Sequence, residues 1–498
     1  MTDTDDLNPS QREAVMHEGG HLLITAGPGT GKTHTLVARI GRVAASLSGH
    51  AKVLAVTFTN KAAGELRDRL EARGVPAGRY EATTFHSFAL GILRRYRSLL
   101  KFPLDFSVIT PEEVEALASS FWPGLTPKQR RGELKKVAQW KASLALSTED
   151  PGILAFSRFL RGLGRVDFDD VLRDAVFLLR DAPDVRASVR AVYRHVMVDE
   201  YQDMNPIQEE LLKCLAGDGV SVSAIGDPDQ AIYGFRGSDA ALFDRYPEVF
   251  SPCRVLALTD NYRSAKDILR AAGQVVARAA GTRRPAPTAR VDAPGMIREY
   301  EAATDRTEAF YIAREIERLI GGTGVDARRS GRSGTEEAVH SFGDIAVLYR
   351  LNAQANALAE ALAKAGIPFH VSGEKAVPDG AEDIYTPRVE KVSLMTLHAS
   401  KGLEFPVVFI TGCEDDLLPL DLEAFAGDPQ EERRLFYVGM TRAGSILYLT
   451  RAQQRSLYGE LLTSVPSRFL ADIAAELRDL RPAAKLRRRP DQGQTKLF

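Results

Sequence analysis

Cysteine is rare in this chain: its 498 residues include only Cys214, Cys253 and Cys413, far apart in the sequence. No Cys-x-x-Cys pair and no His at ligand spacing accompanies them, which argues against a disulfide framework and against a zinc or iron–sulfur centre. Long apolar runs are also missing, since none approaches the about 20 residues that span a bilayer. The N-terminus is acidic and lacks the basic start and apolar stretch of a secretory signal. We therefore expect a cytoplasmic protein with no membrane partner.

A strong charge of either sign is absent as well. The 65 Lys and Arg residues are balanced by 66 Asp and Glu residues, which leaves a net charge of −1. Any contact with a polyanion must therefore come from a local patch of the surface. What is present is a hydrophobic fraction of 44% over a length that suffices for two to four domains.

Short β-branched runs, separated by helical patterns, occur in both halves of the chain. They lie at residues 21–25, 53–58, 195–198 and 220–225, and again at 344–349, 392–397, 407–411 and 446–449. This order predicts an α/β fold with two tandem domains, each with helices covering a largely parallel sheet. The strand signal disappears between residues 102 and 164, where Pro111 opens a helical stretch.

We therefore predict that the first domain carries a helical insertion. A loop rich in Gly, Ser and Arg is expected at 321–334. The predicted parts are residues 1–101 and 165–264 for the first domain, 102–164 for the insertion, 265–480 for the second domain and 481–498 for a flexible tail.

The segment HLLITAGPGTGKT, residues 21–33, combines an apolar strand, a Gly-rich turn and the start of a helix. Glycines allow backbone N–H groups to surround phosphates, and the N-terminus of the following helix adds partial positive charge. In such a loop Lys32 neutralises the β- and γ-phosphates of ATP, and Thr33 helps to hold Mg²⁺. A purely structural turn is the alternative, but the succession of strand, turn and helix favours a phosphate site. The predicted phosphate-binding glycines are Gly27, Gly29 and Gly31.

Two carboxylates follow the apolar strand at residues 195–198. Asp199 can hold Mg²⁺ through its water ligands, and Glu200 can polarise the water that attacks the γ-phosphate. An Asp-Glu pair alone is more often a solvated turn. Together with the upstream loop, the pair indicates an ATPase that uses ATP and Mg²⁺.

Eight segments, taken in order, resemble the motifs of the UvrD/Rep family of superfamily 1 helicases. They are LNPSQ (7–11), TFTNKAA (57–63), TFHS (84–87), DEYQD (199–203), GDPDQAIYGFRG (226–237), NYRS (261–264), TLHASKGLEF (396–405) and RLFYVGMTRA (434–443). The resemblance spans nearly the whole chain. It implies that both α/β domains are RecA-like P-loop domains.

The same resemblance implies roles for six further residues in the nucleotide site. By the family's pattern they read adenine (Gln11), stack on it (Tyr262), contact the ribose (Glu404), sense the γ-phosphate (Gln230) and neutralise its developing charge (Arg263 and Arg442). The expected catalytic set is therefore Lys32, Glu200, Gln230, Arg263 and Arg442.

A motor on single-stranded DNA needs planes on which bases stack and donors for the backbone. For Phe58 and Tyr233 the alternative is core packing, because aromatic residues at strand ends are commonly buried. Phe235 stands where the family usually has Trp, so we expect weaker stacking there. The DNA-binding residues implied by the resemblance are Phe58, Asn60, His86, Tyr233, Phe235 and Arg236 in the first domain, and His398 and Lys401 in the second.

One feature of the family is missing. Only twenty residues, 372–391, separate the segment 366–371 from the strand that begins at Val392. The family normally places a large helical insertion here, which touches duplex DNA and regulates unwinding. A single-strand translocase with limited unwinding therefore stands beside a full helicase as an expectation.

The last five residues, QTKLF, resemble the short peptide that docks bacterial proteins on the replication sliding clamp. Gln494, Leu497 and Phe498 would make that contact, and a frayed terminus is the alternative. The expected function is an ATP-dependent translocase or helicase on single-stranded DNA and its junctions with duplex, moving 3′ to 5′, in DNA repair or replication. Two other hypotheses stay open: an ATP-binding DNA scaffold docked on the clamp, and an RNA-directed P-loop ATPase.

Overall fold

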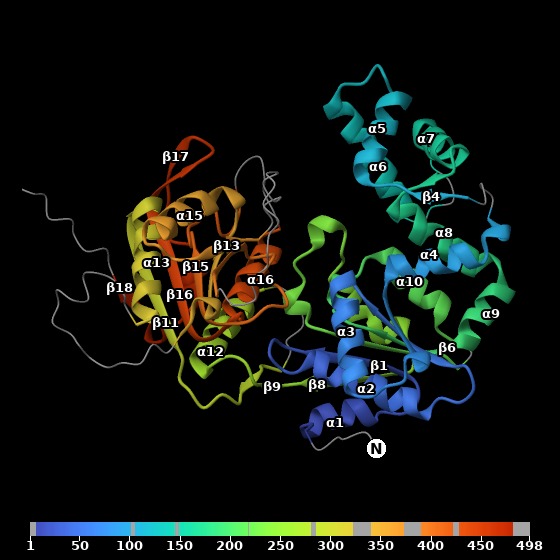
Figure 1. Cartoon of the computed structure of the whole chain (residues 1–498), viewed down its shortest axis with the longest axis horizontal. Helices are drawn as coiled ribbons and strands as arrows, with labels where there is room; N and C mark the ends of the chain where they lie inside the picture. The colour runs from blue at the N-terminus through green and yellow to red at the C-terminus, as the bar shows by residue number, and fades with distance from the viewer. Residues whose placement is uncertain are drawn as a thin grey trace, which may run out of the picture. The chain divides into compact units, whose positions relative to one another are not determined.

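A computed structural model of the chain describes its two units, Met1–Thr259 and Asp260–Phe498, each of which we treat by itself (Figure 1). The described residues are 6–100, 105–143, 145, 148, 150–217, 219–279, 285–321, 340–372, 390–421 and 428–481. Most of the predicted Gly-rich loop at 321–334 and nearly all of the predicted tail at 481–498 lie outside these ranges.

The first unit is built on a six-stranded parallel sheet with strand order β3-β2-β6-β7-β1-β8. One hydrophobic core joins one face of this sheet to α4, α8, α9 and α10, and a second core joins the other face to α2 and α3. Helices on both faces confirm the predicted α/β class. The strands are β1 (His21–Ala26), β2 (Lys52–Thr57), β3 (Tyr80–Thr84), β6 (Tyr193–Val198), β7 (Ser221–Gly226) and β8 (Cys253–Leu258). The helices are α1 (Pro9–Met16), α2 (Lys32–Ser46), α3 (Asn60–Ala72), α4 (Phe85–Arg95), α8 (Phe168–Asp181), α9 (Pro183–Val192), α10 (Pro206–Leu215) and α11 (Ala241–Val249).

Three helices between α4 and α8 form a group with its own small core, visible apart from the sheet in Figure 1. They are α5 (Pro111–Phe121), α6 (Pro127–Ala142) and α7 (Pro151–Gly162). A short parallel pair, β4 (Ser107–Val108) with β5 (Arg165–Val166), connects this insertion to the rest of the unit. The helix predicted to open at Pro111 does begin there.

Four helices of this unit begin with the same local device. In α1, α5, α6 and α10 an Asn or Thr N-cap precedes a proline, and a Gln or Glu at the third helical position completes a capping box. Proline at the first position loses no helical hydrogen bond, and the box satisfies two backbone amides that would otherwise lack partners. These starts are therefore encoded locally.

The second unit contains a larger sheet with order β13-β14-β12-β15-β16-β11-β18, parallel throughout, with β17 antiparallel to β16. Helices α13 and α15 cover one face, and α12 packs against α16 and β16. Its strands are β11 (Met296–Thr304), β12 (Ile345–Tyr349), β13 (Phe369–Val371), β14 (Val392–Thr396), β15 (Phe405–Thr411), β16 (Ala443–Leu457), β17 (Glu460–Thr463) and β18 (Asp479–Arg481), with a separate pair of β9 (Asp260–Asn261) and β10 (Thr288–Ala289). Its helices are α12 (Lys266–Val276), α13 (Asp305–Leu319), α15 (Ala355–Lys364) and α16 (Pro429–Met440).

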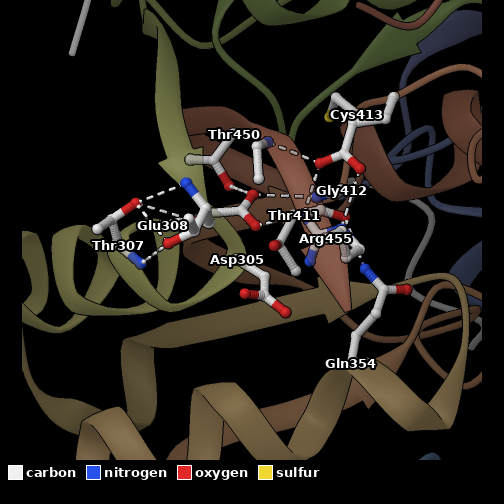
Figure 2. Close-up of polar contacts among 12 residues, drawn as sticks. Asp305, Thr307, Glu308, Gln354, Thr411, Gly412, Cys413, Thr450 and Arg455 are labelled. Carbon is white, nitrogen blue, oxygen red and sulfur yellow. Dashed lines mark hydrogen bonds and ion pairs between the residues drawn. The ribbon is translucent and has the colours of Figure 1, made fainter. Parts of the chain in front are cut away.

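A buried ionic network joins the carboxyl edge of this second sheet (Figure 2). Arg455 on β16 donates to Glu308 on α13 and to both carboxylate oxygens of Glu414, with Nε–Oε2 at 2.9 Å and Nη2–Oε1 at 2.6 Å. Glu308 also accepts hydrogen bonds from the Thr450 hydroxyl at 2.6 Å and the Gly412 amide at 3.1 Å. The side chains of the two glutamates are 1% exposed and that of Arg455 is 5% exposed. Three elements distant in sequence are thereby tied together.

Candidate nucleotide and nucleic-acid site

The Gly-rich turn between β1 and α2 adopts a conformation that only glycine accommodates easily. Gly29 and Gly31 have φ values of 67° and 80°, in the left-handed region. The Thr30 hydroxyl donates to the Gly27 carbonyl at 2.8 Å, which closes the turn. Gly31 caps α2 without a side-chain acceptor, so the helix N-terminus faces the turn with backbone amides. This arrangement suits the binding of a phosphate.

Gln11, predicted to read adenine, lies against this turn. Its Nε2 donates to the Thr30 carbonyl at 3.0 Å, and its Oε1 accepts from the Asn8 amide at 3.0 Å in the capping box of α1. The residue is 4% exposed. A Cβ at Gly31 would lie 2.7 Å from Gln11 Nε2, so glycine is needed there for contact as well as for φ. Support of the turn is a role of Gln11 that its motif did not reveal.

The predicted carboxylates lie next to the P-loop lysine. Strands β6, β7 and β1 are neighbours in a parallel sheet, so their carboxyl ends meet at one edge. There the Glu200 carboxylate is 3.8 Å from Lys32 Nζ, and the Glu200 amide donates to Asp199 Oδ1 at 3.0 Å. Glu200 has φ 50°, a left-handed conformation that is uncommon outside glycine and costs about 1 to 3 kcal/mol. Such strain at a carboxylate is typical of functional sites.

Two residues to which we assigned no role complete this cluster. The Gln202 amide donates to the Glu200 carboxylate, and Gln202 Oε1 accepts from the Asp227 amide at 3.0 Å. Gln230 Nε2 in turn donates to Asp227 Oδ2 at 2.6 Å. Burial raises the pKa of Asp227, while the charge of Lys32 opposes that rise. Gln202 lies in the DEYQD motif and Asp227 in the GDPDQAIYGFRG motif, and this placement was the sequence signal that could have identified them.

The cluster fits a magnesium nucleotide. Lys32 and the helix amides provide positive charge for phosphates, and Asp199 and Thr33 provide oxygen ligands of the kind that Mg²⁺ prefers. Within the described ranges, no group of three or more His, Cys, Asp or Glu side chains could hold a metal by itself.

An exposed aromatic pair lies beyond β7. The rings of Tyr233 and Phe235 are 6.1 Å apart, and the Arg236 guanidinium lies 5.1 Å from the first ring and 5.4 Å from the second. Phe235 is 65% exposed, whereas Tyr233 is half-buried. Two rings and a guanidinium provide the chemistry that binds single-stranded nucleic acid.

Phe58 and His86 occupy a different setting. Phe58 is partly buried against the core, with its ring 5.9 Å from Phe85, so the packing alternative applies to it in part. His86 is half-buried at the start of α4, and burial lowers its pKa, which favours the neutral ring. Asn60 is exposed at the first position of α3.

In the second unit, two predicted nucleotide contacts bind each other. Arg263 Nε donates to Glu404 Oε2 at 2.6 Å, and the Glu404 side chain is 65% exposed. Tyr262, between Asn261 and Arg263, is 51% exposed. Asn261 accepts the backbone amides of Arg263 and Ser264 at 3.0 and 2.8 Å, which fixes the turn that carries these residues.

Arg442 is 1% exposed, the most enclosed of the predicted catalytic residues. Its Nε donates to the Val438 carbonyl and its Nη1 to the Leu403 carbonyl, both at 3.0 Å. His398 and Lys401 are half-buried in the turn after β14, where the Lys401 amide donates to the His398 carbonyl at 3.3 Å. The predicted clamp contacts Gln494, Leu497 and Phe498 lie outside the described residues.

A polar hollow of about 720 Å³ at the carboxyl edge of the second sheet was not anticipated. Its lining includes the side chains of Asn352, Gln354, Asn356, Ser456 and Tyr458. Tyr458 is 70% exposed at the turn between β16 and β17. The lining also includes the charged residues Asp305, Arg306 and Glu360.

Comparison with known families agrees with this geometry. The model of the UvrD/REP helicase N-terminal domain matches residues 7–251, and the model of the UvrD-like helicase C-terminal domain matches residues 256–377 and 378–454. The chain belongs to the UvrD/Rep helicase family.

Curated relatives of this UvrD/Rep family member cover most of its length. The ATP-dependent DNA helicase UvrD1 of Mycobacterium tuberculosis is 28% identical over 682 residues, with 96% of this chain and 86% of the relative covered. UvrD1 of Mycobacterium leprae is 29% identical over 690 residues with the same coverage. The ATP-dependent DNA helicase PcrA of Staphylococcus aureus is 27% identical over 650 residues, with 95% and 86% covered.

The length of these comparisons bears on the missing insertion. The match to the tuberculosis UvrD1 runs over 682 residues although this chain has 498, so at least 184 aligned positions, the difference between the two, have no counterpart here.

Among the described helices of the family member, none is long and apolar enough to cross a membrane.

Proposed function

We propose that this UvrD/Rep family protein is an ATP-driven motor that moves along single-stranded DNA in the 3′ to 5′ direction and acts as a DNA helicase. The observation that carries the proposal is the cluster at the edge of the first sheet, where Lys32, Glu200 and the Gln202–Asp227–Gln230 chain surround a phosphate-binding turn. Family membership and the ATP-dependent DNA helicase names of the relatives support it.

In this proposal each residue of the cluster has a defined task. Lys32 neutralises the β- and γ-phosphates, and Glu200 orients and deprotonates the attacking water. Asp199 and Thr33 would hold Mg²⁺, whose charge draws the phosphate oxygens together. The hydrogen bond to Asp227 sets the side-chain direction of Gln230, which senses the γ-phosphate.

Tasks for the remaining residues follow the family's pattern. Gln11 and Tyr262 would contact adenine and Glu404 the ribose. Arg263 and Arg442 would neutralise the charge that develops on the γ-phosphate. Both guanidinium groups already donate within the second unit, and each has further N–H groups that phosphate oxygens could accept from.

For DNA we propose stacking on Phe58, His86, Tyr233 and Phe235, and backbone contacts from Asn60, Arg236, His398 and Lys401. The strongest support is the exposed Phe235 ring with Arg236 above it. Base stacking is tolerant of sequence, which suits a motor that must pass over any strand.

The short connection between β13 and β14 limits unwinding in this proposal. These two strands pair directly in parallel, and only twenty residues join them. We therefore propose efficient translocation with limited separation of duplex. Docking on a sliding clamp through Gln494, Leu497 and Phe498 would place the motor at sites of DNA repair or replication.

The test is steady-state ATP hydrolysis with and without single-stranded DNA. We expect strong stimulation by DNA, and a loss of at least about 100-fold, or 2.7 kcal/mol, for Lys32→Ala and Arg442→Ala. Lys364→Ala is a matched control, because Lys364 is 58% exposed on α15, where it pairs with its helical neighbour Glu360 and lies over the Phe310 ring. Absence of hydrolysis by the wild type would instead support the ATP-binding scaffold.

Two further arms decide substrate and direction. Equal or greater stimulation by an RNA strand of the same sequence would support an RNA-directed ATPase. Unwinding of a duplex with a 3′ single-stranded tail, but not one with a 5′ tail, would establish the direction. If the 3′-tailed duplex is not unwound but a protein bound to the single strand is rapidly displaced, the result would identify a translocase.

A further inference from the structure

Gln202 is a buried glutamine whose side chain connects two parts of the nucleotide cluster. It lies in the middle of the 3₁₀ helix Tyr201–Asp203, which follows β6 in the chain. The residue is 0% exposed. The neighbouring Tyr201 ring lies 6.1 Å from the ring of Phe243 and 5.0 Å from that of Tyr246, within the core of the first unit. Core packing therefore holds the turn that carries Gln202.

The two ends of the Gln202 side chain have different partners, and these partners fix which end is which. A backbone N–H can only donate a hydrogen bond, and an ionised carboxylate can only accept one. Gln202 Oε1 therefore accepts from the Asp227 amide, at 3.0 Å, and Gln202 Nε2 donates to Glu200 Oε2. Because glutamine carries an acceptor and a donor on one planar group, it satisfies both partners at once.

One end of this bridge is anchored on the sheet. Asp227 comes directly after Gly226, the last residue of β7, and β7 lies between β6 and β1. A Cβ on Gly226 would lie 2.3 Å from Gln202 Oε1, so the end of the strand and the side chain are in close contact. The position of Gln202 is therefore set by an interior strand of the sheet.

The other end of the bridge supports a strained residue. Glu200 has the left-handed φ of 50°, and its side chain is 30% exposed. A strained backbone conformation persists only where the surrounding structure holds it. Gln202 Nε2 contacts one oxygen of the Glu200 carboxylate, and Lys32 Nζ lies 3.8 Å from the other. Each carboxylate oxygen thus faces an N–H donor, which restricts rotation of the carboxylate group.

We infer that Gln202 is a positioning residue for ATP hydrolysis, which holds the Glu200 carboxylate in the direction that receives a proton from the attacking water. The inference rests on the proposed function, because it takes Glu200 to act on that water. A general base must lie within hydrogen-bond reach of the proton that it removes. Since a displacement of about 1 Å can lower a rate by about 100-fold, the hydrogen bond from Gln202 affects kcat rather than nucleotide binding.

The experiment measures steady-state ATP hydrolysis by the full-length protein and by Gln202→Met, with saturating poly(dT). Methionine has nearly the volume of glutamine but lacks the amide donor and the amide oxygen. We expect kcat to fall by about 10- to 150-fold, which corresponds to roughly 1.4 to 3 kcal/mol at 1.36 kcal/mol per tenfold change. The KM for ATP and the Kd for a fluorescent ATP analogue should stay within about threefold of the wild type.

Gln208→Met is the matched control. Gln208 is 6% exposed on α10, and its Oε1 accepts from the Asn205 amide at 3.0 Å in a capping box. It is therefore a buried, hydrogen-bonded glutamine outside the nucleotide cluster. Gln208→Met should lower the melting temperature but change kcat by less than about twofold. Gln202→Met should show its lower kcat at a temperature where both variants are fully folded.

A double-mutant cycle with Glu200→Gln separates positioning from a general structural role. Glu200→Gln removes the base through which Gln202 is inferred to act. In that background Gln202→Met should slow single-turnover hydrolysis of radiolabelled ATP by less than about threefold, because no base remains to be positioned. A structural defect would instead lower the rate by the same factor in both backgrounds.

The outcomes are distinct. A wild type that does not hydrolyse ATP would overturn the proposed function itself. Hydrolysis by the wild type, with a kcat of Gln202→Met within about threefold of it, would overturn the positioning role and leave the motor intact. Additive losses in the double-mutant cycle, or a loss that appears mainly in KM, would also overturn that role.

Discussion

Replacement of Arg455 by methionine tests the network in Figure 2 most severely. Arg455 is the cation between Glu308 and Glu414, and both glutamates are 1% exposed. Removal of one partner from a buried ion pair leaves an uncompensated charge and costs about 3 to 5 kcal/mol. For a unit of this size we expect the melting temperature to fall by about 6 to 20 °C at pH 7.

The loss should depend on pH, with a sign that follows from Glu308. Burial opposes ionisation of Glu308, but the charge of Arg455 and hydrogen bonds from Thr450, Arg455 and Gly412 outweigh it, so its pKa is lowered. A lowered pKa stabilises the fold above the unfolded value of about 4.3 and ceases to do so as pH falls through the folded value. Without Arg455, burial dominates and raises that pKa. The difference between wild type and variant should therefore be largest at pH 7 and shrink towards pH 4.

Thermal unfolding followed by near-ultraviolet circular dichroism measures this, with Arg468→Met as the control. Arg468 is 52% exposed and pairs with Asp415 at 3.2 Å in the same unit, so its loss should cost less than about 1 kcal/mol. A second variant, Arg455→Met with Glu308→Gln and Glu414→Gln, should recover part of the stability. A melting temperature of Arg455→Met within about 2 °C of the wild type, or a difference that grows towards pH 4, would refute the reasoning.

Two further substitutions test the first unit. Lys141→Met leaves Asp167 and Asp170 without their buried cation and should destabilise by about 3 to 5 kcal/mol in thermal unfolding. Lys136 is exposed on the same helix, so Lys136→Met should leave the unfolding temperature close to that of the wild type. Gly226→Ala places a Cβ 2.3 Å from Gln202 Oε1 and should cost about 1 to 3 kcal/mol as well as slow hydrolysis. Gly91 lies inside α4 with open space at the Cβ position, so Gly91→Ala should instead stabilise the fold by about 0.5 to 1 kcal/mol. A Gly226→Ala variant that is more stable than Gly91→Ala would contradict the geometry.

The sequence determined those features of this UvrD/Rep family member that depend on neighbouring residues. Each of the eight predicted strands coincides with an observed strand, because short β-branched runs can be recognised from the local sequence alone. The phosphate-binding turn and the helix starts at Pro9, Pro111, Pro127 and Pro206 are equally local. Contiguous motifs also gave most of the proposed site.

The existence or full length of other strands could be seen only in the folded chain. The edge strand β8 has one fully buried residue, Leu258, and β16 extends over fifteen residues where the pattern predicted only 446–449. Partner strands decide such elements, because their backbone hydrogen bonds are made to residues far along the chain.

Only the tertiary structure decided which polar groups meet. Gln11 contacts Thr30, Lys141 reaches Asp167 and Asp170, and Arg455 reaches a carboxylate 147 residues away. The motif predicts a role for Arg442 at phosphate, and the fold adds hydrogen bonds from its guanidinium to the Val438 and Leu403 carbonyls. The physical reason is that a buried charge or amide takes whichever partners the packing of helices and strands brings within about 3 Å, and no local pattern encodes that choice.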